Sequence, residues 1–266
     1  MSDTTTLAAE PALARLDWEC RHFGLPAAQL CDPDLNDVAL AAALGRARRE
    51  GVELLVWPAR GGRDVPGELL EEFAGTLVDR KATFSRSLPP APAGDDSPPV
   101  CQFSMGAYTA KTPSAALYEL AISAGIYSRF NVDPRIPAEK FAAMYRRWIE
   151  RSVAGELADV VLVASLGDHE GAVDERPRGM ITLSESSGVG SIGLIAVAAE
   201  VRGRGIAAAL MHAAHGWMRA RGAGEARVVT QLANLPACRL YERCGYRLSR
   251  VQHYYHFWPL ATSHEP

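Results

Sequence analysis

Cysteine is scarce in this sequence, and its spacing matches no metal or redox site. The five cysteines are an odd number without a Cys-x-x-Cys pair, and they stand at positions 20, 31, 101, 238 and 244. This pattern argues against a disulfide framework and against a cysteine-rich zinc site. It is typical of a protein from a reducing compartment, so we expect a cytoplasmic protein that works without a metal.

The sequence also lacks a long apolar run and an excess of positive charge. No apolar stretch approaches the roughly 20 residues of a membrane-spanning helix, and no signal peptide precedes the first polar residues. The formal net charge is -3, from 28 basic and 31 acidic residues. We therefore expect neither a membrane protein nor a nucleic-acid-binding module, although a local basic pocket is compatible with this balance.

Proline is concentrated in one segment, which divides the chain. Residues 89–99 read PPAPAGDDSPP and contain almost no apolar side chain, a composition typical of a linker. The 266 residues are 48% hydrophobic, which is enough for a substantial core. We therefore expect a small α/β domain over residues 1–95, ending in this linker, and a larger domain over residues 96–266.

Hydrophobic periodicity predicts helices and strands on both sides of the linker. Before it, the pattern predicts a helix over 34–50, a strand over 52–57, a helix over 67–73 and a strand over 76–84. After it, the predicted order is β-α-α-β-β-β-α-β-α-β, with a loop at 126–131 between the first two helices. The later strands are expected over 101–108, 159–165, 180–184, 192–199, 227–232 and 248–258, and the later helices begin near residues 113, 137, 206 and 236.

Residues 191–210, SIGLIAVAAEVRGRGIAAAL, combine an apolar strand, a glycine-rich turn and the start of a helix. The first backbone N–H groups of a helix have no partner within it, and the helix dipole adds partial positive charge there. Gly203 and Gly205 let a ligand approach the backbone closely because neither carries a Cβ atom. With Arg202 and Arg204 beside them, this turn is suited to a pyrophosphate.

The turn differs from two common phosphate-binding motifs. It lacks the Gly-Lys-Ser/Thr of a Walker A loop, and an alanine at position 208 breaks the G-x-G-x-x-G dinucleotide fingerprint. It fits instead the pattern Arg-x-x-Gly-x-Ala. A second segment further along the chain fits Asn-x-x-Ala-x-x-x-Tyr-x-x-x-Gly-Tyr, which is met by Asn234, Ala237, Tyr241, Gly245 and Tyr246.

Together, the two motifs resemble those of the Gcn5-related N-acetyltransferases, the GNAT family. The resemblance implies an α/β fold with a mixed sheet, the GNAT acyl-CoA transferase fold, which the small α/β domain precedes here. It also implies acetyl-CoA as the cosubstrate. The residues that it places at the coenzyme are Leu194, Ala196, Val197, Arg202, Gly203, Arg204, Gly205, Ile206, Ala207, Asn234 and Tyr241.

The resemblance further implies roles for individual residues. The amides of 202–207 bind the pyrophosphate, Asn234 contacts the coenzyme A arm, and Tyr241 protonates the departing thiolate. A backbone N–H group of residues 195–197 supplies the oxyanion donor if the strand bulges there. An isolated tyrosine on an amphipathic helix is usually a core residue, but two motifs in the right order favour a catalytic role for Tyr241.

The general base stays open between several residues. The family pattern places an acidic residue after a Leu-Val pair, which Asp79 fits, although aspartate replaces the expected glutamate and is one methylene shorter. A solvated surface carboxylate is the alternative interpretation of Asp79. Glu119, His253 and His256 are rival candidates, since a carboxylate or an imidazole can accept a proton near neutral pH.

A narrower resemblance concerns the acceptor. The segment LDWECRHFG, the triplet Ser128-Arg129-Phe130, the helix FAAMYRRWIERSV and the closing aromatic strand look like the TDP-fucosamine acetyltransferases, whereas the long proline-rich linker departs from them. That resemblance implies a dTDP-4-amino-4,6-dideoxy sugar as the amine substrate. Arg129 would then bind the diphosphate, and Phe130 would pack against the base or sugar. The alternative, which stays equally open, is that Arg129 is a surface residue and Phe130 a core residue.

Other functions are compatible with the same motifs. The chain could acetylate another amine, such as a protein amino terminus, an aminoglycoside or a small metabolite. It could also be an acyl-CoA sensor without turnover, although a sensor has no use for the proton donor Tyr241. The aromatic last strand could pair across a homodimer.

Overall fold

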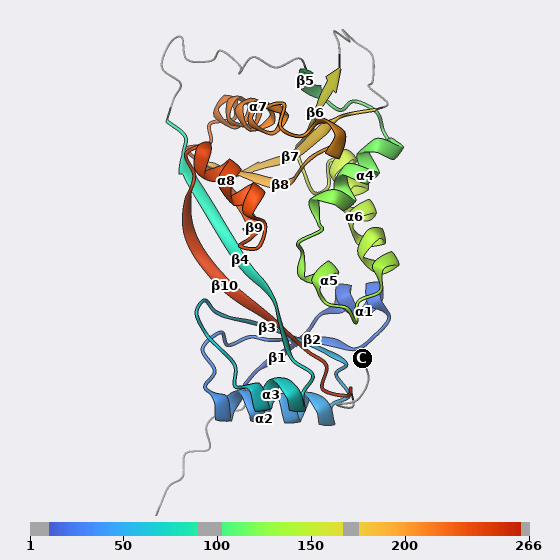
Figure 1. The fold of residues 1–266 in the computed structure, drawn as a ribbon, viewed down its shortest axis with the longest axis vertical. Helices are drawn as coiled ribbons and strands as arrows, with labels where there is room; N and C mark the ends of the chain where they lie inside the picture. Colours follow the sequence, from blue (N-terminus) through green and yellow to red (C-terminus); the bar gives the residue numbers. More distant parts are fainter. Residues whose placement is uncertain (1–10, 90–102, 167–175, 262–266) are drawn as a thin grey trace, which may run out of the picture. The chain divides into compact units, whose positions relative to one another are not determined.

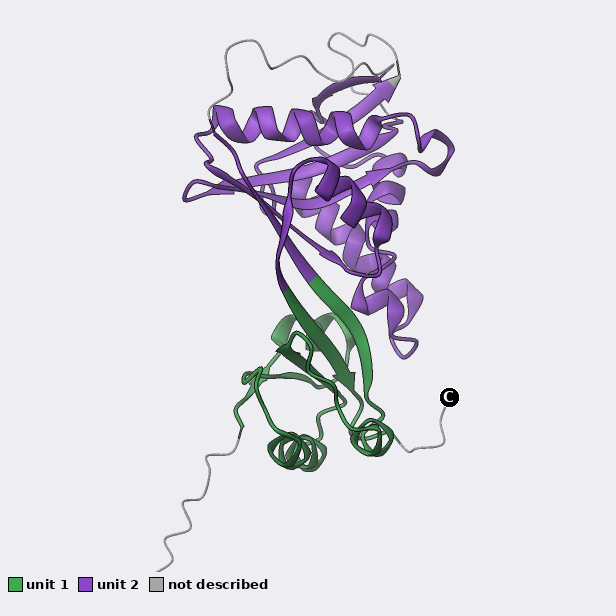
Figure 2. Ribbon diagram, turned by 60° about the vertical axis from the view of Figure 1, so that its left-hand side comes forward, with its two compact units in different colours: residues 1–81, 251–266 green, residues 82–250 purple. Residues whose placement is uncertain are grey.

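The computed structural model of the 266-residue chain describes residues 11–89, 103–166 and 176–261, and it divides into two compact units. One unit comprises residues 1–81 with 251–266, and the other residues 82–250 (Figure 2). Strand β4 (Thr76–Ser87) and strand β10 (Arg247–Phe257) contribute residues to both units. Most of the proline-rich segment at 89–99, where the sequence predicts the domain boundary, lies outside the described residues.

The first unit is a small α/β body. Strand β2 runs parallel to β3, and β10 pairs antiparallel with β3. A core of fully buried side chains, among them Leu40, Leu44, Trp57 and Phe257, joins helix α2 to this sheet. Its elements are β1 (Leu13–Arg15), α1 (Asp17–Phe23), β2 (Ala27–Leu30), α2 (Asp37–Arg49), β3 (Leu54–Arg60), α3 (Gly67–Glu72) and parts of β4 and β10 (Figure 1).

The second unit has the element order that the sequence predicts. Between two of its helices the prediction of a loop at 126–131 is wrong, because Arg129–Val132 form one helical turn, α5, whose backbone N–H groups donate back toward Ser128. Its elements are β5 (Phe103–Ala107), α4 (Ala115–Ala124), α5, α6 (Ala138–Val153), β6 (Val160–Leu166), β7 (Gly179–Ser186), β8 (Val189–Val197), a 3-10 turn η1 (Ala199–Val201), α7 (Ile206–Ala220), β9 (Glu225–Gln231) and α8 (Leu235–Arg243).

The sheet of the second unit combines antiparallel and parallel pairing. In the hydrogen-bonded order β4-β9-β8-β7-β6-β5, strands β5 to β8 are antiparallel neighbours, whereas β8 and β9 run parallel. Helix α7 connects that parallel pair and shares one hydrophobic core with α8 and with Phe84, Leu183 and Val228. Helix α4 packs on β7 and β8, and α6 packs on β6. The parallel pair therefore lies in the middle of the sheet, flanked by helices.

Candidate functional site

Strands β8 and β9 separate part-way along their length. Their parallel pairing runs from Val189↔Glu225 to Ile192↔Val228 and ends there in the described part of the chain. On its other edge, β8 continues to pair with β7 as far as Val197. The edge of β8 that faces β9 is therefore free of strand pairing over residues 193–197. This stretch includes residues 195–197, where the family resemblance predicts the oxyanion donor.

A β-bulge interrupts β8 at the point where the strands separate. Partners are Leu183↔Ile192 before it and Ile181↔Ile195 after it, so that one residue of β7 opposes two residues of β8. The bulged residues are Gly193 and Leu194. The sequence places a bulge within 195–197, and the structure places it immediately before that stretch.

The bulge determines which backbone groups reach the unpaired edge. Beyond it, the Ala198 N–H donates to the Arg178 carbonyl at 2.8 Å, toward β7. Backbone groups alternate between the two edges of a strand. The N–H groups of Val197 and Ile195 therefore point to the opposite edge, away from β7. Two adjacent donors on an unpaired edge are the arrangement that a developing oxyanion needs.

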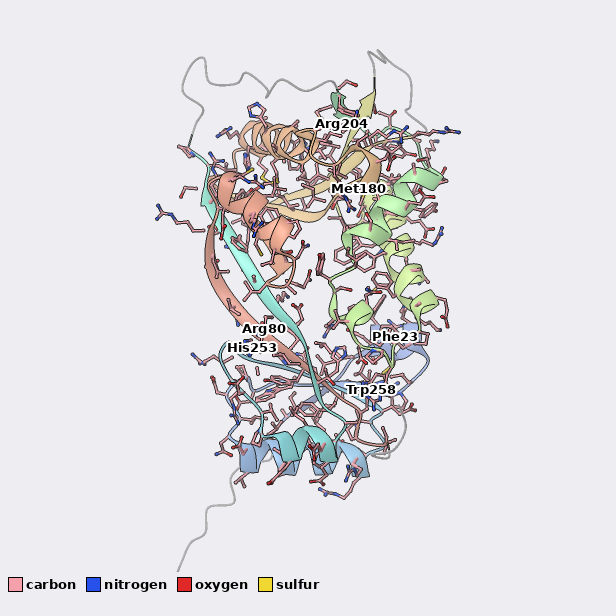
Figure 3. The ribbon with its side chains drawn as sticks, viewed as in Figure 1. Phe23, Arg80, Met180, Arg204, His253 and Trp258 are labelled. Carbon is pink, nitrogen blue, oxygen red and sulfur yellow. The ribbon has the colours of Figure 1, made fainter. Side chains whose placement is uncertain are left out.

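The glycine-rich turn follows directly and leads into α7. Gly203 and Gly205 have left-handed backbone angles, with φ of 79° and 81°, and a Cβ atom added to either would meet no atom within 4 Å. Among the described residues, no side chain caps the start of α7, so its first N–H groups are available to a ligand. Arg202 and Arg204 are exposed beside them, and Figure 3 labels Arg204. This turn is therefore a candidate anion site.

Helix α8 carries the second motif. Asn234 is its N-cap, and the side-chain Oδ1 accepts the Ala237 N–H at 3.2 Å. Tyr241 is 2% exposed, and its ring lies 5.8 Å from that of Phe84 and 6.0 Å from that of Tyr246. Burial raises the pKa of Tyr241 above its usual range, so the hydroxyl is protonated at neutral pH.

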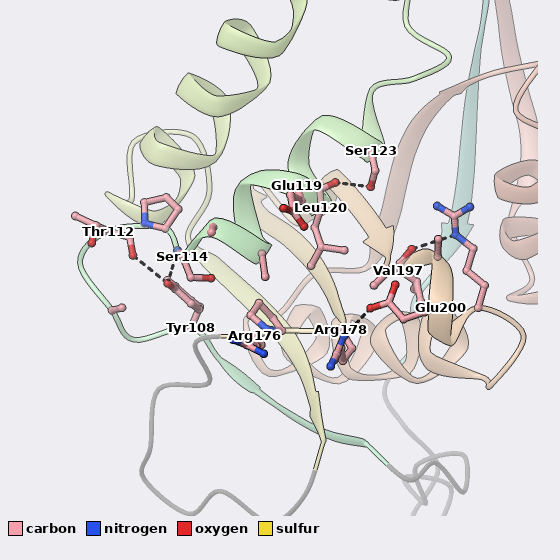
Figure 4. A pocket seen from close by; sticks show the side chains of 18 residues that line it. Tyr108, Thr112, Ser114, Glu119, Leu120, Ser123, Arg176, Arg178, Val197 and Glu200 are labelled. Atoms are coloured by element: carbon pink, nitrogen blue, oxygen red, sulfur yellow. Dashed lines mark hydrogen bonds and ion pairs between the residues drawn. The ribbon is translucent and has the colours of Figure 1, made fainter.

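A pocket of about 960 Å³ lies where helix α4 faces the end of β8 (Figure 4). Val197 and Arg202 line it from the β8 side, and Glu119 lines it from α4. Glu200, also in its wall, forms an ion pair with Arg178 at 2.6 Å. The pocket thus joins two residues predicted to bind the coenzyme with one of the rival general bases.

Comparisons with known proteins match this part of the chain to one family. Residues 126–246 match the model of the Acetyltransferase (GNAT) family. The match covers a little under half of the chain, and we call the unit that contains it, residues 82–250, the GNAT unit. A crystal structure of a GCN5-related N-acetyltransferase from Sphaerobacter thermophilus shares the fold, with a TM-score of 0.56 and 21% identity, covering 94% of this chain and 78% of that one.

Two curated relatives share part of the GNAT sequence. Streptothricin acetyltransferase from Escherichia coli is 35% identical over 30% of this chain and 46% of the relative. Spore coat polysaccharide biosynthesis protein SpsD from Bacillus subtilis (strain 168) is 30% identical over 54% of this chain and 47% of the relative. The chain therefore spans less than half of the length of each of these relatives.

The other predicted site residues are divided between the two units. Arg129 and Phe130 lie on α5 in the GNAT unit, where the guanidinium carbon lies 4.4 Å from the centre of the Phe130 ring. Asp79 is buried on β4 and belongs to the first unit. Tyr241 belongs to the GNAT unit, so Asp79 remains a prediction for the general base.

The histidine candidates of the last strand are buried in the first unit. His253 (Figure 3) is near the Gly62 N–H, 3.3 Å from Nε2, and the Arg63 carbonyl, 3.2 Å from Nδ1. A neutral ring satisfies both contacts, with Nε2 accepting and Nδ1 donating. These contacts explain His253 as a structural residue. His256 is fully buried on the same strand.

The sequence did not indicate Thr182, Arg178 or Glu200 as residues of this region. In the sequence, Thr182 is a single hydroxyl residue within the apolar part of β7. Arg178 stands just before β7 and Glu200 shortly after β8, which is the only sequence feature that indicates their ion pair. Across the described residues, no group of three or more His, Cys, Asp or Glu side chains gathers as a metal site would need. None of the described helices has the length and hydrophobicity of a membrane span.

A polar network in the GNAT unit is centred on the buried side chain of His215. His215 on α7 contacts the Tyr246 hydroxyl at 2.9 Å through Nε2 and the Arg86 guanidinium at 3.5 Å through Nδ1. Because a guanidinium has no acceptor, Nδ1 accepts and Nε2 carries the proton toward Tyr246. Burial and the nearby positive charge of Arg86 lower the pKa of His215 to about 4, so the ring is neutral in the folded protein.

His215 is therefore expected to make the fold acid-labile. Its pKa is lowered from 6.5 to about 4, so the unfolded chain binds this proton at a higher pH than the folded protein does. The free energy of unfolding should fall by about 3 kcal/mol as the pH falls through that window. Urea unfolding at several pH values measures this fall.

His215→Gln should flatten the pH dependence of unfolding, because glutamine does not titrate. The matched control is His212→Gln on the same helix, where the histidine is only half-buried. That variant should keep the parent slope. Equal slopes in the parent protein and in His215→Gln would show that His215 does not titrate in this way.

Proposed function

We propose that the chain is an acetyl-CoA-dependent N-acetyltransferase that acts by direct attack of an amine in a ternary complex. The observation that carries this proposal is the unpaired edge of β8. There, the N–H groups of Ile195 and Val197 are unpaired with another strand, and the chain continues from them into the candidate anion site at the start of α7. An acyl donor with a thioester at one end and a pyrophosphate further along fits this sequence of donors.

Each part of the reaction has a candidate residue. The amine forms a C–N bond to the carbonyl carbon of the acetyl group, which gives a tetrahedral intermediate, and the C–S bond to coenzyme A breaks when this intermediate collapses. The N–H groups of Ile195 and Val197 hold the negative oxygen of the tetrahedral intermediate. The Tyr241 hydroxyl gives its proton to the departing thiolate, and a general base accepts the proton that the amine loses.

The base is assigned to Asp79 by the family pattern, with Glu119 as the competing residue. Glu119 is supported by its place in the pocket beside Val197. A 4-amino sugar is a weaker base than lysine because of its neighbouring oxygens. A modest or water-relayed base is therefore sufficient for such a substrate.

For the acceptor, we propose the amino group of a dTDP-4-amino-4,6-dideoxy sugar. The Arg129–Phe130 pair supports this choice, because a guanidinium binds a diphosphate bidentately and an aromatic ring packs on a base or sugar. The partial likeness to SpsD, a polysaccharide biosynthesis protein, also supports a sugar. The partial likeness to streptothricin acetyltransferase favours, as a second candidate, an amine of a small antibiotic.

Thiol release from acetyl-CoA tests the proposal. The panel of amines comprises dTDP-4-amino-4,6-dideoxygalactose, its glucose epimer, streptothricin, an aminoglycoside and an amino-terminal peptide. We expect turnover with the nucleotide sugars and little with the peptide. Turnover confined to the antibiotics would replace the sugar assignment. No turnover with any amine, despite acetyl-CoA binding, would contradict the enzyme and favour an acyl-CoA sensor.

A further inference from the structure

Thr182 lies directly opposite the bulge of β8. Its side chain is 1% exposed, and its hydroxyl Oγ1 accepts the Leu194 N–H at 2.8 Å. Leu194 is itself buried, at 5% exposed. In a regular ladder a backbone carbonyl accepts such an N–H group, but the extra residue of a bulge disturbs that pairing. The threonine hydroxyl supplies the acceptor at the bulge, and a buried donor without one is costly.

Gly193, one of the two bulged residues, leaves room for the Thr182 hydroxyl because it has no side chain. A Cβ atom added to Gly193 would lie 2.8 Å from Thr182 Oγ1, closer than real Cβ atoms approach a neighbour. The threonine hydroxyl therefore occupies the space that the missing side chain leaves. Thr182 and Gly193 are complementary in shape as well as in hydrogen bonding, which points to a defined conformation of the bulge.

The bulge changes which amides face the unpaired edge. The Leu183 carbonyl accepts the Asp159 N–H at 2.8 Å, so Leu183 turns its backbone groups toward β6. Its partner Ile192 consequently turns toward β9. Without an extra residue, positions 194 and 196 would follow Ile192 on that edge. With the bulge, Ile195 and Val197 take their place, and these are the proposed oxyanion donors.

We propose that Thr182 is a positioning residue for acetyl transfer: its hydroxyl holds the bulge that directs the Ile195 and Val197 N–H groups to the thioester carbonyl. This inference rests on the proposed function. Thr182 does not itself touch the reacting atoms. It acts through the Leu194 amide and the strand that follows it.

The test compares two variants of one side chain in the full chain. Thr182→Val keeps the shape and removes the acceptor, whereas Thr182→Ser keeps the hydroxyl and removes the methyl group. We expect kcat to fall roughly ten-fold to a hundred-fold in Thr182→Val and to stay near the parent value in Thr182→Ser. The KM for acetyl-CoA should change little in both, because the pyrophosphate turn at 202–207 is untouched.

Amide hydrogen exchange gives a second readout that needs no turnover. Exchange at Leu194, Ile195 and Val197 should be faster in Thr182→Val than in Thr182→Ser, and exchange in β5 and β6 should match the parent in both. A valine variant with parent kcat and parent exchange would overturn the inference, as would equal losses of kcat in the two variants. A parent protein inactive with every amine would contradict the proposed function, and the catalytic part of this inference with it. The exchange comparison would still decide whether Thr182 holds the bulge.

Discussion

Replacing Tyr241 with phenylalanine is expected to lower kcat roughly ten-fold to ten-thousand-fold, which is the range for losing a general acid. Tyr241 is buried among aromatic rings, and its pKa is raised, so that its hydroxyl is protonated throughout the neutral range. Coenzyme A leaves more easily as a protonated thiol than as a thiolate. Phenylalanine keeps the ring and removes only that donor.

The binding of acetyl-CoA should be nearly unchanged in Tyr241→Phe, because phenylalanine keeps the ring, and the proposed contacts of the thioester carbonyl and the pyrophosphate are made by residues 195–197 and 202–207. Steady-state kinetics measure kcat, and calorimetry measures the dissociation constant of acetyl-CoA. Unchanged binding with a reduced kcat would place the loss in the chemical step. Parent turnover in this variant would remove Tyr241 from the mechanism.

Tyr246→Phe is the matched control for Tyr241→Phe. Tyr246 is equally buried, and its pKa is likewise raised by burial, but its hydroxyl is held by His215 at 2.9 Å. Its removal should cost about 1 kcal/mol of stability through the lost hydrogen bond and leave kcat near the parent value. A similar fall of kcat in both variants would mean that the aromatic cluster, and not one hydroxyl, supports turnover.

Helices with a long apolar stripe could be predicted from the sequence almost to the residue. Helix α6 is expected over 137–153 and is observed over Ala138–Val153, because Phe141, Met144, Tyr145 and Ile149 repeat at helical spacing and are all buried. Elements of three or four residues offer no such period. Strands β1 and β2 and the single turn α5 were therefore missed or taken for a loop.

The GNAT motifs could likewise be predicted, but the geometry between strands could not. The turn at 202–207 and the cap Asn234 are local features, because residues that are close in the sequence determine them. The bulge depends on the register between β7 and β8, and one inserted residue changes the edge that every later amide faces. No property of Thr182 or Gly193 alone reveals that they are opposite each other.

The division of the chain into compact units also depends on contacts between distant segments. Proline content at 89–99 predicts a domain boundary in a segment that lies mostly outside the described residues, and the two compact units divide at residues 81 and 250, within β4 and β10. Composition reports local chain preferences. The extent of a compact unit depends instead on which distant strands pair, and those pairings are non-local.

The second large effect is expected at the anion site. Gly205→Ala should weaken acetyl-CoA binding roughly ten-fold to a hundred-fold, which corresponds to the loss of a charge-assisted hydrogen bond. Gly205 has φ of 81° and lies directly before α7. A methyl group there points into open space in the free protein, where the pyrophosphate is expected to approach, and the left-handed backbone becomes strained.

Gly222→Ala separates binding from strain, because Gly222 lies just after the other end of α7. Its φ is 80°, and a Cβ atom there would also meet nothing within 4 Å. Both alanine variants should therefore lose about 1 to 2 kcal/mol of stability from the left-handed conformation. Only Gly205→Ala should lose affinity for acetyl-CoA, because the N-terminus of a helix attracts anions and its C-terminus repels them. Equal affinities in the two variants, measured by calorimetry, would place the pyrophosphate away from this turn.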